Sequence, residues 1–198
     1  VKYNALAGDH ASAHSFFGAA CGTNATTLGT GCNGNGDGQI GHDNASDTYG
    51  EEPKFFEHLS RAGLIANNYD GSCVEQDSCE YHAGVNVPKS SWNGGVWGIL
   101  AKGCEECSFT NYETVFVFTS AVRTDGDPNL AFSSNAHGII FPQDMWSIDV
   151  KYDDGMPNAG KIMSMDGATG GCGGGSATDP YNPTSTEKCS AYFSPSGF

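Results

Sequence analysis

Eight cysteines, arranged along the chain as four local couples, constrain this sequence more than any other feature. They are Cys21, Cys32, Cys73, Cys79, Cys104, Cys107, Cys172 and Cys189. An even number of cysteines without a cytosolic signature favours an oxidising compartment, where disulfides persist. Pairing sequence neighbours closes short loops between glycine-rich stretches. The sequence therefore predicts four disulfides, which are Cys21–Cys32, Cys73–Cys79, Cys104–Cys107 and Cys172–Cys189.

A redox-active dithiol and a zinc site are the alternative uses of these cysteines. Cys104 and Cys107 have dithiol spacing, but the two glutamates between them would raise the thiol pKa values, and no strand–helix–strand pattern precedes them. A structural zinc site needs a second couple at matching spacing, which the five residues between Cys73 and Cys79 do not provide. Disulfides remain the preferred interpretation.

The length and composition suit one globular domain. The chain has 198 residues, which is enough for one hydrophobic core and too few for two comfortable domains. Only 16% of the residues are charged and 28 are glycine, which argues against both a disordered tail and a helical bundle. We expect a turn-rich domain that contains strands, without internal repeats or an interdomain linker.

Acidic residues outnumber basic ones by 23 to 9, which gives a net charge of −14 at pH 7. This charge repels phosphate backbones and anionic lipid head groups, so we expect no nucleic-acid or membrane-surface partner. The longest apolar runs, such as 115–118 and 138–141, are far shorter than the roughly 20 residues that span a bilayer. Because the chain begins at Val1 without a signal peptide, we expect a processed protein or a piece of a longer one.

Local patterns predict the main helices and strands. Asp9 has the chemistry of a helix cap and predicts a short helix within 9–20. Pro53, after two glutamates, precedes apolar residues at helical spacing and predicts a helix over 54–63. The segment 113–122 is rich in β-branched and aromatic residues, so we expect it to be a central strand.

The second half of the chain adds weaker patterns. Pro142 predicts the start of a helix that runs to about 151, and a turn at 153–155 follows it. Residues 161–165 are predicted to return as a strand. Residues 85–100 are expected to form extended segments, interrupted by Pro88 and by two successive glycines.

The segment 33–40 has the spacing of the first half of an EF-hand-type calcium loop. Oxygen-bearing side chains alternate, glycine stands at the sixth position and isoleucine at the eighth. The expected ligands are Asn33, Asn35, Asp37, Gln39 and Asp43. The twelfth position is Asn44 rather than glutamate, so any calcium affinity should be weak. Other candidates for the missing carboxylate are Asp47, Glu51 and Glu52. The alternative is an Asn-Gly turn cluster that binds no ion.

No catalytic motif stands out, and we expect no enzyme. His10 and His14 lie four apart beside Asp9 and would form a metal half-site on a helix, but no third ligand is identifiable. The glycine-rich segment 170–176 lacks the lysine of a phosphate-binding loop. No pair among the 23 acidic residues is singled out as the two carboxylates of a glycosidase.

Five stretches, taken in order, carry a resemblance to a known family. They are KYNALAGD at 2–9, NGNGDGQI at 33–40, FFEHLSRAGLI at 55–65, GVNVPKS at 84–90 and SIDVKYDDGMPNAGK at 147–161. Together they resemble the globular part of bacterial type IV pilins and of pilin-like proteins with a prepilin-type N-terminus. The loop between Cys172 and Cys189 is similar to the C-terminal disulfide region of a pilin, and its closure contributes about 3 kcal/mol in the chain-entropy model.

The resemblance implies an α+β fold in which a long N-terminal helix lies on an antiparallel sheet. It places the end of that helix and the start of a connecting loop at 1–20. A long loop region at 21–100, the sheet at 101–168 and a disulfide loop at 172–189 complete this arrangement. The apolar half of the helix, which anchors a pilin in the inner membrane and packs the filament core, would precede Val1.

The function implied by the resemblance is that of a structural subunit of a cell-surface pilus, used in adhesion, motility or surface contact. Its partners would be other copies of itself and the pilus assembly machinery, with a membrane-anchored form before assembly. One alternative is a pseudopilin of a type II secretion system. Another is a secreted calcium-dependent carbohydrate-binding module, suggested by Trp92, Trp97 and the Asn/Asp-rich loops. Exposed tryptophans would favour this module, whereas buried ones would belong to the core.

Overall fold

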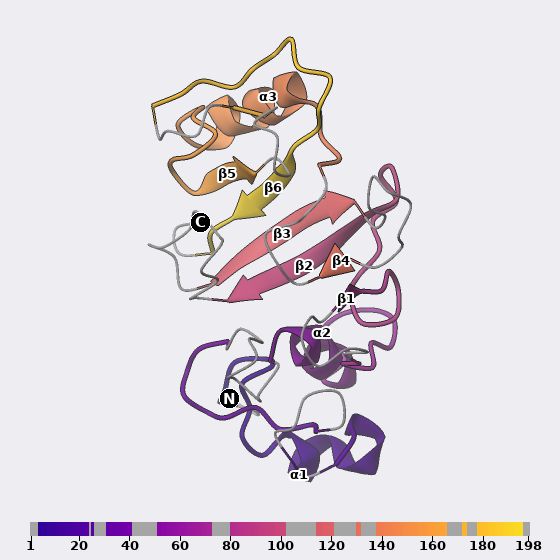
Figure 1. Cartoon of the computed structure of the whole chain (residues 1–198). Coiled ribbons are helices and arrows are strands. Elements are labelled where there is room, and N and C mark those ends of the chain that lie inside the picture. The colour runs from indigo at the N-terminus through magenta and orange to yellow at the C-terminus, as the bar shows by residue number, and fades with distance from the viewer. Residues whose placement is uncertain are drawn as a thin grey trace.

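The fold combines helices with a four-stranded antiparallel sheet. It is seen in a computed structural model that describes residues 4–23, 25, 31–40, 51–72, 80–101, 114–120, 130–131, 138–165, 172–173 and 178–195. In Figure 1, helix α3 (Pro142–Tyr152) and helix α1 (Ala13–Phe17) lie at opposite ends of the molecule. The sheet and helix α2 (Glu51–Arg61) lie between them.

The strands of the main sheet follow the order β2-β3-β6-β5. Their bounds are Gly95–Ala101 for β2, Thr114–Ser120 for β3, Ser190–Phe193 for β6 and Ile162–Met165 for β5. Strand β3 has partners on both edges, as its β-branched and aromatic composition predicts. A separate two-stranded sheet pairs β1 (Glu80–Tyr81) with β4 (Leu130–Ala131).

The sheet extends beyond the range 101–168 that was expected for it. Strand β2 begins at Gly95, inside the expected loop region, and pairs with β3 over its whole length. Strand β6 follows the C-terminal disulfide loop and inserts between β3 and β5. The predicted strand at 161–165 is confirmed as β5. The sheet order joins segments that are distant in sequence, and local patterns carry no information about that order.

Helix α3 packs beside β5 and begins at Pro142, as the sequence predicts. Met145 and Asp149 are its buried residues toward the middle of the helix. Met145 belongs to a core cluster whose other members are Phe118, Ile139, Ile140, Ile162, Cys172, Tyr181, Cys189 and Ala191. The core therefore lies between α3, the sheet and the C-terminal disulfide.

The disulfide Cys172–Cys189 attaches the C-terminal region to this core. Both cysteines are buried, with their Cα atoms 5.4 Å apart. The Cys189 carbonyl accepts hydrogen bonds from the N–H groups of Ile139 and Ile140, at 2.8 and 3.0 Å. Gly138 lies against the Lys188 backbone, with no room for a Cβ atom. The start of β6 is thus held both covalently and by backbone pairing.

Helix α2 starts three residues earlier than predicted and carries two different faces. Its aromatic side contacts the sheet and the following loop, because Phe55 lies 5.8 Å from Phe116 and Phe56 lies 6.1 Å from Tyr69, measured between ring centroids. Its polar residues contact the N-terminal region. Helix α2 therefore joins the N-terminal region to the sheet.

The N-terminal region is less helical than expected. Residues 4–12 form turns, and positive φ angles at Asn4 (46°) and Gly8 (87°) interrupt any helix there. Helix α1 begins after Ser12 and continues into a 3₁₀ turn, η1, at Gly18–Cys21. The expected helix end at 1–20 is therefore a turn followed by a short helix. Asp9 is not its cap, because its carboxylate binds a loop further along the chain.

Helices α2 and α3 have 11 residues each. In the described part of the chain, no helix has the length and apolar character required to cross a membrane.

Candidate functional site

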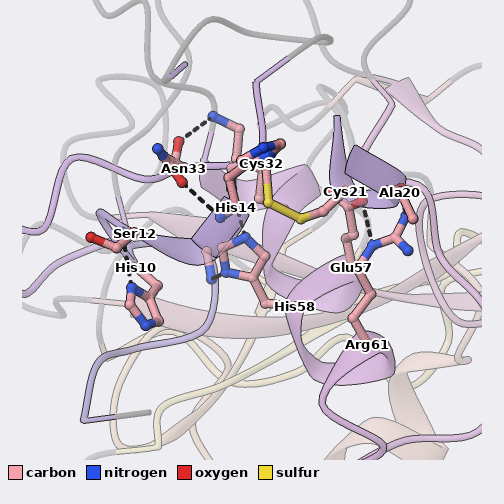
Figure 2. Close-up of a disulfide and its surroundings, with 12 residues drawn as sticks. His10, Ser12, His14, Ala20, Cys21, Cys32, Asn33, Glu57, His58 and Arg61 are labelled. Atoms are coloured by element: carbon pink, nitrogen blue, oxygen red, sulfur yellow. Dashed lines mark hydrogen bonds and ion pairs between the residues drawn. A yellow bond between two sulfur atoms is a disulfide. The ribbon is translucent and has the colours of Figure 1, made fainter. Parts of the chain in front are cut away.

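One polar face of α2 contacts several described segments of the N-terminal region. Glu51, Lys54, His58 and Arg61 follow one another at intervals of three or four, which places them on one side of a helix. Their partners lie between Gly8 and Asn35. Figure 2 shows His58 and Arg61 beside the Cys21–Cys32 disulfide that closes part of this region.

His58 is buried and uses both ring nitrogens. Its Nδ1 accepts a hydrogen bond from the Gly8 N–H at 2.9 Å, and its Nε2 donates to the Cys32 carbonyl at 2.8 Å. The Phe17 ring lies 5.6 Å from the imidazole. Burial lowers the pKa of His58 to about 4, although the hydrogen bond to Cys32 acts in the opposite direction. The neutral ring therefore links α2, the N-terminal turn and the first disulfide loop.

The Cys21–Cys32 disulfide, one of the two expected pairs within the described residues, packs against Ala13 and Phe17. Arg61 donates to the Ala20 carbonyl from Nη2 and to Glu57 Oε1 from Nε, the latter at 2.8 Å. Burial raises the pKa of Glu57 to about 7, while the Arg61 charge opposes that shift. The expected pairs Cys73–Cys79 and Cys104–Cys107 lie outside the described residues.

The loop at 33–39 wraps around the carboxylate of Asp9. Three successive N–H groups, those of Gly36, Asp37 and Gly38, donate to it at 2.6, 3.0 and 2.9 Å. Asp9 is only 2% exposed. Hydrogen bonds from backbone N–H groups stabilise a buried carboxylate, so this loop has a fixed shape around a residue from a distant segment.

Two further carboxylates approach the same loop. Glu51 at the start of α2 accepts the Asn35 N–H at 2.7 Å. Asp37 accepts the Gln39 N–H at 2.8 Å and the Asn35 side-chain amide at 3.2 Å. Carboxylate oxygens of Asp9, Asp37 and Glu51 all lie within 4.8 Å of one another. We call these three residues the acidic triad.

The residues predicted to bind calcium have different places in the structure. Asn33 supports the loop, because its side-chain oxygen accepts the His14 N–H and its carbonyl accepts the Lys54 ammonium, both at 2.9 Å. Asn35 and Asp37 form the exposed turn beside Asp9. Gln39 is exposed next to that turn, and Asp43 lies outside the described residues.

The sequence interpretation does not connect Asp9 with the loop at 33–39, because Asp9 stands in another segment. A glycine-rich loop with several N–H groups in succession needs a hydrogen-bond acceptor, and that requirement is the signal that could have led to it. Glu51 is one of the candidate carboxylates that the sequence offers. Oxygen ligands of this kind suit a hard cation such as calcium.

The histidine half-site that the spacing of His10 and His14 suggested, and for which no third ligand was identifiable, has no common helix face in the structure. His10 lies before α1, and its Nδ1 accepts the Ser12 N–H at 3.1 Å. His14 lies within α1. The helical spacing argument for these two residues is therefore wrong, because the helix starts between them.

A second group of carboxylates holds the turn between α3 and β5. Asp149 accepts the Tyr181 hydroxyl at 2.7 Å and the Gly155 N–H at 3.1 Å. Burial raises the pKa of Asp149 to about 6, against the effect of these two hydrogen bonds. Asp153 accepts the N–H groups of Lys161 and Ile162. In the described residues, these carboxylates stabilise the turn by accepting hydrogen bonds.

In the described residues, the candidate site is therefore a network of hydrogen bonds around α2, with the acidic triad at its edge. Among known proteins, no family model, curated protein or solved structure matches the chain.

Proposed function

We propose that this chain is the globular domain of a type IV pilin-like protein, a structural subunit of a cell-surface filament. The observation that carries the proposal is the position of β6. This last strand lies between β3 and β5, and the Cys172–Cys189 disulfide fixes its start. The resemblance implies an antiparallel sheet followed by a C-terminal disulfide region, and a disulfide loop attached to the sheet supports this arrangement.

Four of the five resembling stretches provide the second support, because they form parts of helices, or loops and turns next to the main elements. Residues 33–40 form the loop around Asp9, and 55–65 cover most of α2. Residues 84–90 run beside β2 through the Lys89–Val96 bridge. Residues 147–161 cover the second half of α3 and the turn that leads to β5.

Physical conditions outside a cell agree with this function. An exposed filament cannot be refolded by chaperones, so covalent links that restrict the unfolded chain are useful there. In this proposal the partners are other copies of the protein and the pilus assembly machinery. The mature location is the cell surface, after a membrane-anchored stage.

We propose calcium as the ion for the acidic triad. Asp9 and Glu51 are buried, and placing three carboxylates this close together costs free energy through mutual repulsion. A divalent cation would offset that cost, and its oxygen ligands would be the three carboxylates and the side chain of Asn35. Calcium would tie the loop at 33–39 to the start of α2.

Fractionation of the producing bacterium tests the filament proposal. Surface filaments are sheared from the cells, and peptides of this chain are measured by mass spectrometry in the filaments, the periplasm and the medium. The proposal expects most of the protein in the sheared filaments. Protein confined to the periplasm would favour a pseudopilin, and monomeric protein in the medium would favour a secreted module; either result contradicts a surface pilus.

A further inference from the structure

Two tryptophans form an exposed aromatic surface at the start of β2. Trp92 is 45% exposed and Trp97 is 37% exposed. Trp97 stands opposite Phe118 in the pairing of β2 with β3, and both indoles contact that phenylalanine. Single exposed apolar residues are common, but here two exposed indoles pack against the same ring. We call Trp92, Trp97 and Phe118 the aromatic platform.

The two indoles of the platform pack against phenylalanine rings of the sheet. Trp92 stacks on Phe118 with an interplanar angle of 21° and a centroid distance of 5.7 Å. Trp97 lies 4.8 Å from Phe118 and 5.8 Å from Phe193. Phe118 itself is only 6% exposed. The indoles are thus packed on protein on one side and reach solvent on the other, so little side-chain freedom remains to be lost on binding.

The backbone that carries Trp92 is a tight turn. The Gly95 N–H donates to the Trp92 carbonyl at 2.9 Å, and Asn93 and Gly94 have φ angles of 48° and 72°. Positive φ at both central residues is the signature of a type I′ turn, which Asn-Gly favours. A Cβ atom at Gly95 would lie 2.6 Å from Phe118, so this position needs glycine for the ring to pack.

Polar residues neighbour the two tryptophans in the sequence. Lys89, Ser91 and Asn93 are exposed on the segment that includes the turn. The Ser90 hydroxyl accepts a hydrogen bond from the backbone N–H of Trp92 at 3.1 Å, which fixes the turn further. A rigid aromatic surface beside a few hydrogen-bonding groups is the usual composition of a small-molecule binding site.

We propose that the aromatic platform binds neutral, β-linked pyranose oligosaccharides. The C–H groups on the face of such a sugar carry partial positive charge and pack on the negative face of an indole, while the ring hydroxyls would bond to polar residues of the neighbouring segment. The protein carries a net charge of −14, which disfavours anionic ligands. An uncharged ligand avoids this repulsion.

The wild-type chain can be tested directly, because it contains only three tryptophans. The indole N–H signals of the ¹⁵N-labelled 198-residue chain are followed by NMR during titration with cellotetraose and with chitotetraose. The proposal expects the Trp92 and Trp97 signals to shift with at least one of them. Trp146, which is 47% exposed on α3, serves as the internal control and should not shift. No shift at millimolar sugar, or equal shifts of all three signals, would overturn the proposal.

Variants separate binding from folding. Trp92→Ala should weaken oligosaccharide binding about tenfold or more, the effect typical of losing a central aromatic contact. Trp92→Phe should retain part of the affinity, and Trp146→Ala should retain all of it. Indole shifts that depend on protein concentration without sugar would assign the platform to contact between copies and overturn the proposal. The experiment uses the isolated chain, so its outcome is independent of filament assembly.

Discussion

His58 shows how a single buried polar residue joins separate parts of this chain. Both ring nitrogens have backbone partners, in the N-terminal turn and in the first disulfide loop. A neutral imidazole satisfies both partners, because one nitrogen accepts and the other donates. A charged imidazole would carry hydrogens on both nitrogens and lose the bond to Gly8. The contribution of His58 to folding therefore depends on pH.

Replacing His58 with glutamine should reveal this dependence. The folded pKa of about 4 lies below the ordinary 6.5, so the stabilisation is present above about pH 6.5 and is lost as the pH falls toward 4. The free energy of unfolding of the wild type, relative to His58→Gln, should fall by about 2 kcal/mol between about pH 8 and about pH 5. Urea unfolding at the two pH values measures this difference.

His10→Gln is the matched control, because His10 is only half-buried and its bond is local. If the free energies of unfolding of the wild type and His58→Gln differed by the same amount at both pH values, this would contradict the account.

The wild type must be compared with a variant because Glu57 changes the free energy of unfolding with pH in the opposite direction. Its folded pKa of about 7 exceeds the ordinary 4.5, so its contribution is present below about pH 4.5 and is lost as the pH rises through 7.

At the level of secondary-structure elements, the loop at 33–39 depends on close contact between its own backbone and the backbone at Gly8 and Asp9. An added Cβ at Gly34 would overlap the Gly8 carbonyl and the Asp9 backbone. Gly34→Ala should therefore lower the free energy of unfolding by about 3 kcal/mol or more, since neither backbone can move without breaking the bonds around Asp9. Thermal or urea unfolding of the purified variant measures the loss.

Gly38→Asn provides a control in the same loop. Gly38 has a φ of 87° and no atom within 4 Å of an added Cβ. Asparagine tolerates positive φ better than other residues, so the loss should be about 1 kcal/mol or less. Equal losses of unfolding free energy for the two variants would contradict this explanation. They would show that backbone conformation, rather than the close approach of two backbone segments, determines the effect.

The acidic triad supports a prediction about metal removal. With free calcium about tenfold above a dissociation constant on the order of 1 mM, binding should stabilise the fold by about 1.4 kcal/mol and raise the melting temperature by a few degrees. A chelator should remove this increase, and Asp37→Ala should abolish the response. Asp144→Ala, an exposed change on α3, should leave it intact. Identical melting curves of the wild type with chelator and with calcium would contradict the proposal.

Strong local signals made several elements predictable. The β-branched run of β3 and the prolines near the starts of α2 and α3 indicated those elements in approximately the right places. Strand β6 was missed, because four residues carry no clear periodicity and its conformation depends on pairing with β3 and β5. The role of Asp9 in the loop at 33–39 was not predictable for the same kind of reason, because its partners lie in another segment of the chain.

At the level of the whole molecule, the disulfides are the feature that the sequence indicated best. Two of the four expected pairs lie in the described residues, and both are formed. We expect non-reducing digestion to release linked peptides for the other two pairs, Cys73–Cys79 and Cys104–Cys107. Free thiols at Cys104 and Cys107 would contradict this pairing and favour a redox-active dithiol.

The central claim is that this domain belongs to a filament subunit, and top-down mass spectrometry of the native protein tests it most directly. The account predicts an apolar segment of about 20 residues upstream of Val1, long enough to span a membrane. Its first residue should be N-methylated, with a glutamate near the fifth position, as the resemblance to type IV pilins implies. A cleaved signal peptide ending close to Val1 would contradict the claim and identify a free secreted protein.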